Sequence, residues 1–159
     1  MRRIILALFI IGIFSRVFAY AYSETNFQLA IFWPIQIYGS KTSINGFRFN
    51  FLYGVSEDVV GVDLGGINVA NGDAAACQFG IVNVVKGDFL GLQTGGISIS
   101  GGTVTGMQYS LYNKASEMIG VQVGLVNEAE VLKGLQIGII NINKSGRPFR
   151  FLPIVNFSY

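Results

Sequence analysis

Apolar and polar positions alternate along most of this chain in an eight-residue frame that recurs every 14 or 15 residues. The clearest copy is residues 134–141 (GLQIGIIN), where glycine, glutamine, glycine and asparagine stand at the first, third, fifth and eighth positions. Stacked copies of one short unit can bury a surface that a single copy cannot, so this frame predicts a repeat protein. Earlier copies begin at Gly120, Gly106, Gly91, Ala76, Gly61 and Gly46.

Polar residues recur at two positions of the frame. The structural repeat positions are Gln78, Gln93, Gln108, Gln122, Gln136, Asn68, Asn83, Asn113, Asn127 and Asn141. Each glutamine shares a strand face with small residues, whereas the alternate residues are apolar. Arg48 and Asp63 replace glutamine in two neighbouring copies. We expect these two opposite charges to form an ion pair within the sheet.

The alternation predicts strands, and the segments between copies predict turns. Asn-Gly, Lys-Gly-Asp and Gly-Gly sequences are typical of tight turns, and the recurring glycines disfavour helix. Residues 22–45 form a lead-in of one or two strands that is interrupted by Pro34, and the pattern does not assign it to the sheet. We expect strands at residues 46–54, 59–69, 74–84, 89–99, 103–112, 117–126, 131–142 and 149–159, the last being a degenerate copy.

Two all-β architectures fit this pattern. The favoured one is an antiparallel meander of about 8–10 strands that closes as a small outer-membrane-type β-barrel, with the apolar face outside and the glutamine face in a filled lumen. The alternating aromatic strand that ends in Tyr159 is similar to the C-terminal assembly signal of such barrels. The alternative is a β-solenoid in which each 14–15-residue repeat is one coil, with stacked glutamines and asparagines and buried apolar rows. A repeat only one strand long favours this alternative, and the lack of a recognisable polar cap at either end counts against it.

The N-terminus predicts export. Arg2 and Arg3 precede an apolar run, and a small-x-small site follows at residues 19–21, as in a secretory signal peptide spanning residues 1–21. Residues 22–159 would then form a single β-repeat domain, with eight 14–15-residue repeats in 46–159. Three of the 11 basic residues leave with the signal, so eight remain against nine acidic ones. This balance argues against nucleic acid as a partner.

The composition offers little catalytic chemistry. The chain has no histidine, which is the commonest metal ligand and general base, and most acidic residues fall in turns. The carboxylate pairs Glu57/Asp58 and Glu128/Glu130 are interpreted as solvated turn charges. Cys77 occupies an apolar position of the frame, so we expect a small buried side chain there. No catalytic residue, metal site or cofactor is predicted, and the chain is expected not to be an enzyme.

Several stretches resemble one known family. Residues 120–127 (GVQVGLVN) and 134–141 look like the GLQIGLVN-type repeats of a bacterial surface-repeat family named from leptospiral surface proteins. Residues 46–54 and 151–159 look like the lead-in and the ending of that family. The resemblance covers residues 27–159 and departs from the family pattern at Asp63, Ala76, Thr94 and Ser110.

The resemblance implies export and a location at the cell surface or in the bacterial outer membrane, with outer-membrane lipid as a partner. It supplies no catalytic residue and no host ligand. Together with the signal peptide, it leads us to expect a non-enzymatic surface or outer-membrane β protein with a structural role. The alternative is a binding module, either an adhesin-like β-solenoid or a small-ligand barrel.

Overall fold

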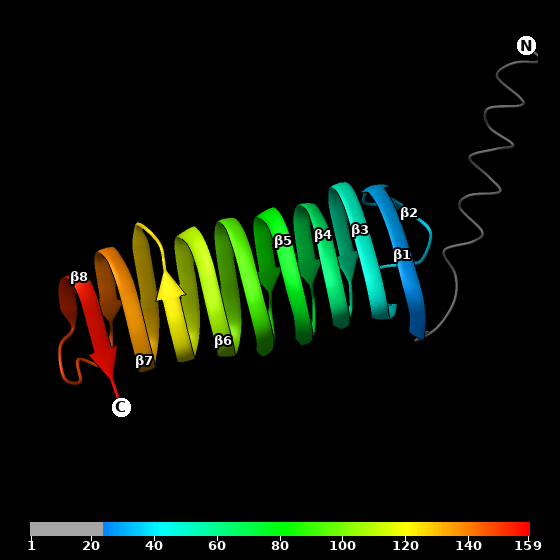
Figure 1. Cartoon of the computed structure of the whole chain (residues 1–159). Coiled ribbons are helices and arrows are strands. Elements are labelled where there is room, and N and C mark those ends of the chain that lie inside the picture. Colours follow the sequence, from blue (N-terminus) through cyan, green and yellow to red (C-terminus); the bar gives the residue numbers. More distant parts are fainter. Residues whose placement is uncertain (1–23) are drawn as a thin grey trace, which may run out of the picture.

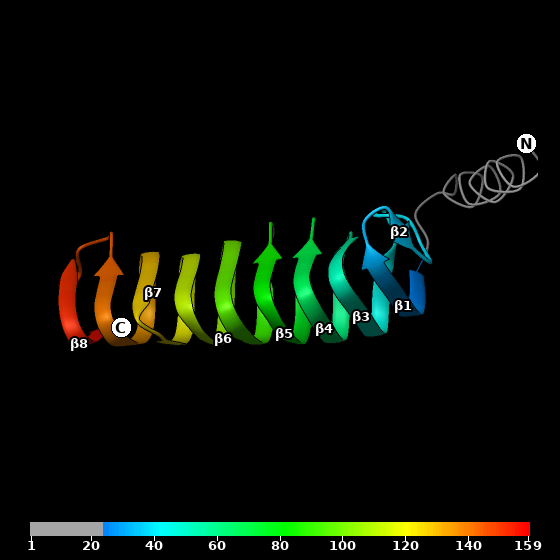
Figure 2. The ribbon, with the colours of Figure 1, turned by 90° about the horizontal axis from the view of Figure 1, so that it is seen from above.

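Stacked strands make up residues 24–159, the part of the chain that this computed structural model describes. The chain winds into a β-solenoid of about eight turns, seen from the side in Figure 1 and from above in Figure 2. One sheet joins the strands in the order β2-β1-β3-β4-β5-β6-β7-β8. Their bounds are β1 (Glu24–Phe32), β2 (Ile35–Gln36), β3 (Ser43–Ser56), β4 (Val59–Ala70), β5 (Ala74–Val85), β6 (Phe89–Val123), β7 (Val126–Asn143) and β8 (Phe151–Ser158). The all-β prediction is confirmed, and the predicted signal peptide lies outside the described residues.

The coils stack in parallel, so the prediction of a closed antiparallel barrel is wrong. Strands β4 and β5 pair in parallel with Gly61 opposite Ala76, and β6 pairs with β7 with Gly120 opposite Gly134. These registers equal one repeat, which places each position of the frame directly above the same position of the preceding copy. A meander would need neighbouring strands to reverse direction. The alternative of one 14–15-residue repeat per coil is confirmed.

Glycine at the first position of the frame lets the coil bend. The backbone has positive φ, between 115° and 135°, at Gly61, Gly91, Gly106 and Gly120. A Cβ atom on Gly120 would also collide with the carbonyl oxygen of Gly106 in the preceding coil. Backbone conformation and close stacking therefore both favour glycine at these residues, and Ala76 is the one first-position residue among the seven copies that is not glycine. Through these bends the three strands expected at residues 89–126 run on as the single strand β6, which ends at Val123.

Each coil turns a mixture of apolar and polar side chains inward. In β4 these are Val59, Asp63, Asn68 and Ala70, all fully buried. The apolar members stack from coil to coil into a core that also contains Phe89, Met118 and Leu132. The glutamine and asparagine positions stack beside this core.

The large apolar residues of the frame point outward. Ile139 is 66% exposed, and Cys77 is exposed as well. The expectations that a solenoid would bury its apolar rows and that Cys77 would be buried are therefore wrong. The inward face is the polar one, as the barrel prediction had it and the solenoid alternative did not, because stacked amide side chains satisfy one another between coils.

Antiparallel strands close both ends of the solenoid. Strand β2 pairs antiparallel with β1, and β8 pairs antiparallel with β7, which sets Asn156 opposite Gln136. The lead-in joins the sheet, because β1 pairs in parallel with β3 and aligns Gln28 with Arg48. Residues 151–158 therefore form a cap rather than a further parallel coil. The described residues contain no helix long and apolar enough to cross a membrane.

Candidate functional site

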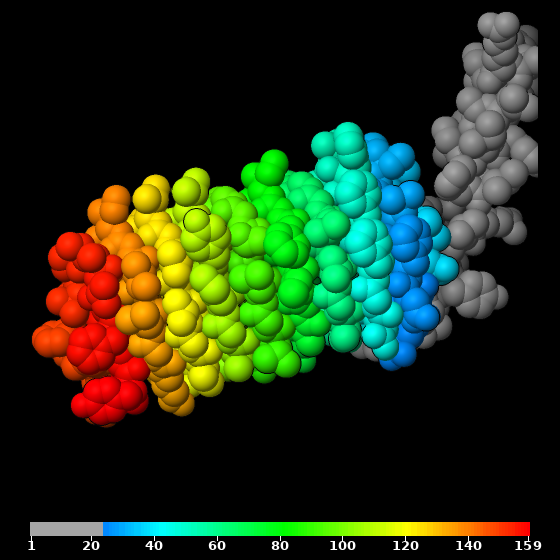
Figure 3. Space-filling view, viewed as in Figure 1, coloured from blue at the N-terminus to red at the C-terminus, as the bar shows by residue number. Residues whose placement is uncertain are grey.

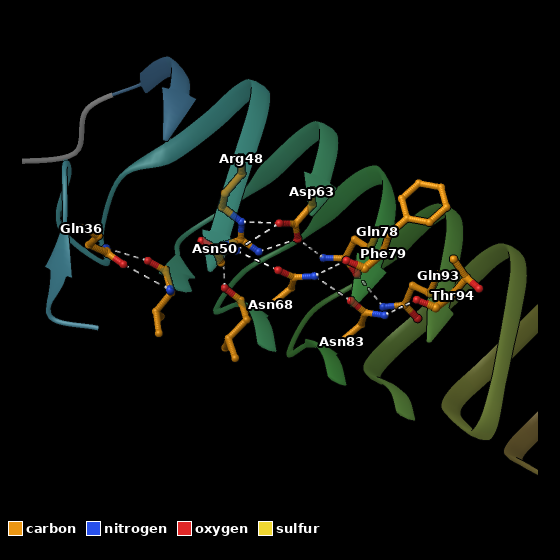
Figure 4. A network of polar contacts seen from close by, with 12 residues as sticks. Gln36, Arg48, Asn50, Asp63, Asn68, Gln78, Phe79, Asn83, Gln93 and Thr94 are labelled. Atoms are coloured by element: carbon orange, nitrogen blue, oxygen red, sulfur yellow. Dashed lines mark hydrogen bonds and ion pairs between the residues drawn. The ribbon is translucent and has the colours of Figure 1, made fainter. Parts of the chain in front are cut away.

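A row of glutamine side chains runs through the interior along the solenoid axis. Its N-terminal part is drawn in Figure 4. From Gln93 onward, each Nε2 donates to the Oε1 of the glutamine one coil earlier, at 2.9 Å from Gln93 to Gln78 and 2.8 Å from Gln136 to Gln122. In three coils Nε2 also donates to a backbone carbonyl of its own coil, that of Lys114, Glu128 or Ile142. The glutamine positions thus form one continuous ladder that supports the fold.

The asparagines form a second ladder, whose donors point the other way. The Nδ2 atom of Asn68 donates to Oδ1 of Asn83 in the next coil at 2.9 Å, and Asn127 donates to Asn141 at 2.8 Å. Glycine at the fifth position leaves room for them, because a Cβ atom on Gly80 would lie 2.6 Å from the Nδ2 of Asn68. Each Nδ2 of this ladder also donates to a backbone carbonyl of the following coil, namely Phe79, Thr94, Val123, Ile137 or Leu152.

Two serines replace this arrangement in the middle of the solenoid. Ser98 stands at an asparagine position, and Ser110 stands at the glycine position of the next coil. Their Oγ atoms are 2.7 Å apart and share a hydrogen bond. The smaller side chain at residue 98 leaves the space that the hydroxymethyl group of Ser110 fills. Sequence reasoning identified Ser110 as a departure from the family pattern but missed its partner, although both departures fall in adjacent copies.

Arg48 and Asp63, which we expected to pair, form a bidentate ion pair inside the solenoid (Figure 4). Arg48 Nε lies 2.7 Å from Asp63 Oδ1, and Nη2 lies 2.6 Å from Oδ2. Both side chains are 0% exposed. Arg48 Nη1 also donates to the carbonyl of Val69, and Gln78 donates to Asp63 Oδ2 at 2.8 Å. The pair therefore terminates the glutamine ladder and has no access to a substrate.

The turn aspartates form a ladder of their own. Asp58 Oδ1 accepts the backbone N–H of Asp73 at 2.9 Å, and Asp73 Oδ1 accepts that of Asp88 at 2.8 Å. Asp88 in turn accepts the backbone N–H of Thr103. Each carboxylate thus connects its turn to the next one, which is a structural role.

The second carboxylate pair of the sequence analysis is bridged by a lysine. Lys144 Nζ lies 2.8 Å from Glu128 Oε1 and 2.7 Å from Glu130 Oε1. The hydrogen bond from Lys144 lowers the pKa of Glu128, and the same bond raises the pKa of Lys144. Within residues 24–159, no cluster of histidine, cysteine, aspartate and glutamate side chains could hold a metal ion.

The outer surface of the solenoid is the remaining candidate for binding, because the interior polar side chains bond to one another. The coils pack against one another in successive bands along the solenoid (Figure 3). At the sixth position of the frame, most copies carry an exposed apolar side chain, whereas Gly66 and Gly96 interrupt the row. We call this row the apolar ridge, and its members are Phe51, Ile81, Leu111, Leu125 and Ile139.

A shallow groove of about 470 Å³ runs beside the apolar ridge. Its floor includes fifth-position residues such as Gly124 and Gly138, and Tyr109, Val123 and Ile137 line it from the fourth position. Sequence reasoning identified these residues as one apolar strand face but did not predict the groove, which exists because glycine lies between two rows of large side chains. No family model, no curated protein and no solved structure matches this chain.

Proposed function

We propose that this chain is an exported, non-enzymatic protein of the bacterial outer membrane or cell surface with a structural role. The observation that carries the proposal is the apolar outer surface of the solenoid. Soluble monomers rarely expose large contiguous apolar patches, and such patches mark contact with another protein or with lipid.

The interior supports the same function. The glutamine, asparagine and arginine side chains of the frame are buried and hydrogen-bonded to neighbouring coils, and the turn carboxylates bond to backbone N–H groups or to lysine. These contacts stabilise the fold and leave no described cluster of free acid, base and nucleophile for catalysis. The signal-peptide pattern at residues 1–21 and the resemblance to the surface-repeat family favour export to the envelope.

Fractionation of a bacterial host that expresses the full chain tests this function. We expect the protein in the washed outer-membrane fraction, with its N-terminus cleaved near residue 21. We also expect it to resist extraction by salt and carbonate and to require detergent. Retention in the cytoplasm, or release from membranes by salt alone, would refute the proposal.

A second candidate function is an adhesin-like binding module. The groove beside the apolar ridge favours it, because concave apolar surfaces of 300–1,000 Å³ are typical of ligand sites. A protein that is secreted and remains soluble without detergent would favour this function over the structural one.

A further inference from the structure

Surface charge and apolar side chains are separated around the circumference of the coils. The fourth to seventh positions of the frame contain no charged residue in any of the six copies between β4 and β7, which are residues 64–67, 79–82, 94–97, 109–112, 123–126 and 137–140. The exposed and half-buried charges of these coils belong instead to the turns and their flanks, which we call the charged edge. Its members are Asp73, Lys86, Asp88, Lys114, Glu117, Glu128, Glu130 and Lys133.

We propose that the apolar ridge inserts into the acyl region of a lipid layer, with the solenoid axis along the layer and the charged edge in water. This inference rests on the proposed envelope location, in which lipid is the expected partner, and adds the surface that contacts lipid and the orientation of the solenoid. Lipid complements this charge distribution, since an acyl phase accepts the uncharged side while water and headgroups solvate the charged one.

The shape of the ridge favours lipid over a second copy of the chain. The ridge is a corner, and apolar side chains continue from it onto both flanks, with Tyr109 exposed on one flank and Ile140 on the other. A fluid acyl phase contacts both flanks of a corner at once. A rigid second solenoid would cover one flank and leave the other in water.

The backbone under the ridge is suited to an apolar phase. The N–H of Leu125 donates to the carbonyl of Leu111 at 3.0 Å, and the N–H of Ile140 donates to the carbonyl of Leu125 at 2.9 Å. Hydrocarbon offers no partner for a free backbone group, so a surface that enters it needs such internal bonds. The coil-to-coil pairing supplies them between the coils of Leu111, Leu125 and Ile139.

Flotation of the full exported chain with zwitterionic phosphatidylcholine vesicles tests the insertion, because these vesicles carry no net charge that could attract the protein electrostatically. The variant is Leu111→Gln on the ridge, where the leucine is 61% exposed. The matched control is Leu90→Gln, where the leucine is 57% exposed but lies beside Asp73 and Asp88 on the charged edge. Circular dichroism checks that both variants keep the β fold.

We expect the wild-type chain to float with the vesicles. Leu111→Gln should lower its partition coefficient about tenfold or more, whereas Leu90→Gln should change it less than about twofold. Adding Leu125→Gln to Leu111→Gln should lower the partition coefficient further, by a similar factor. A wild-type chain that stays unbound, or equal losses at residues 90 and 111, would overturn the insertion.

Sedimentation of the protein without lipid tests whether the ridge binds a second copy of the chain instead. A wild-type dimer that becomes monomeric in Leu111→Gln would assign the ridge to a second copy and overturn the proposal. The fractionation experiment distinguishes a failure of the insertion from a failure of the proposed function. A chain that resides in the outer membrane without binding vesicles refutes only the insertion, and a chain that is never exported refutes the proposed function.

Discussion

Removal of one partner of the Arg48–Asp63 pair should destabilise the solenoid strongly, whereas replacement of both by glutamine should not. Both side chains are 0% exposed, so solvent does not screen the charge that remains after a single substitution. A buried charge left without its partner costs about 3–5 kcal/mol. We therefore expect Asp63→Gln and Arg48→Gln each to lower the free energy of unfolding by about that amount.

The double variant extends the ladder already present in the later coils. A glutamine at residue 63 can accept from Gln78 and donate to a glutamine at residue 48, so no charge is left unpaired. Its cost is the small cavity left by the arginine and the lost contact to the carbonyl of Val69, together about 1–2 kcal/mol. The double variant should consequently be more stable than either single variant.

Urea unfolding of the four proteins, followed by circular dichroism at neutral pH, measures these differences. Amide hydrogen exchange in β3 and β4 reports the local effect if the solenoid unfolds coil by coil. Single substitutions that cost less than about 1 kcal/mol, or a double variant that loses the sum of both singles, would refute the proposed energetics.

Three further predictions concern a compensated pair, a bend and a pH dependence. Ser98→Asn should destabilise the fold by about 1–3 kcal/mol because Ser110 fills the space, and adding Ser110→Gly should restore most of that loss in thermal or urea unfolding; an unrescued double variant contradicts the compensation. Gly120→Ala should cost more than about 1 kcal/mol, since alanine meets both positive φ and the preceding carbonyl; an unchanged urea midpoint would count against that requirement. Because its folded pKa is lowered, Glu128 contributes stability above its unfolded pKa that is lost as pH falls through the folded value. An NMR titration should show the pKa of Glu128 rising toward its ordinary value in Lys144→Gln, and an unchanged pKa would exclude Lys144 as the cause.

The sequence predicted the repeat unit, and the solenoid alternative predicted the stacking of its polar positions, but the favoured barrel misjudged how the strands pair. The informative signal was that the repeat is only one strand long. A parallel stack repeats after every strand, whereas an antiparallel meander repeats only after every second strand. The signal peptide and the aromatic ending at Tyr159 favoured a membrane barrel instead. Neither of these features carries information about whether neighbouring strands run parallel or antiparallel.

Which face lies inside could not be derived from the alternation alone. Residues such as Ile139 and Leu111 are apolar enough for a core, and ordinary burial preferences place them there. The structure turns them outward because the side chains of Gln136 and Asn141 bond inside the solenoid, to amide side chains of the preceding coil and to backbone carbonyls. The caps were missed for a related reason: the antiparallel pairing of Asn156 with Gln136 depends on the reversal of the chain after Asn143, which the degenerate repeat conceals.

The opposed donor directions of the two interior ladders have an electrostatic consequence. Every ladder amide of the glutamine row points its N–H toward the N-terminal end, and the amides of the asparagine row point theirs toward the C-terminal end. Aligned amides in one row would add their dipoles along the axis, as peptide units do in a helix. Two antiparallel rows cancel, so the solenoid can lengthen by whole coils without building up a potential difference between its ends.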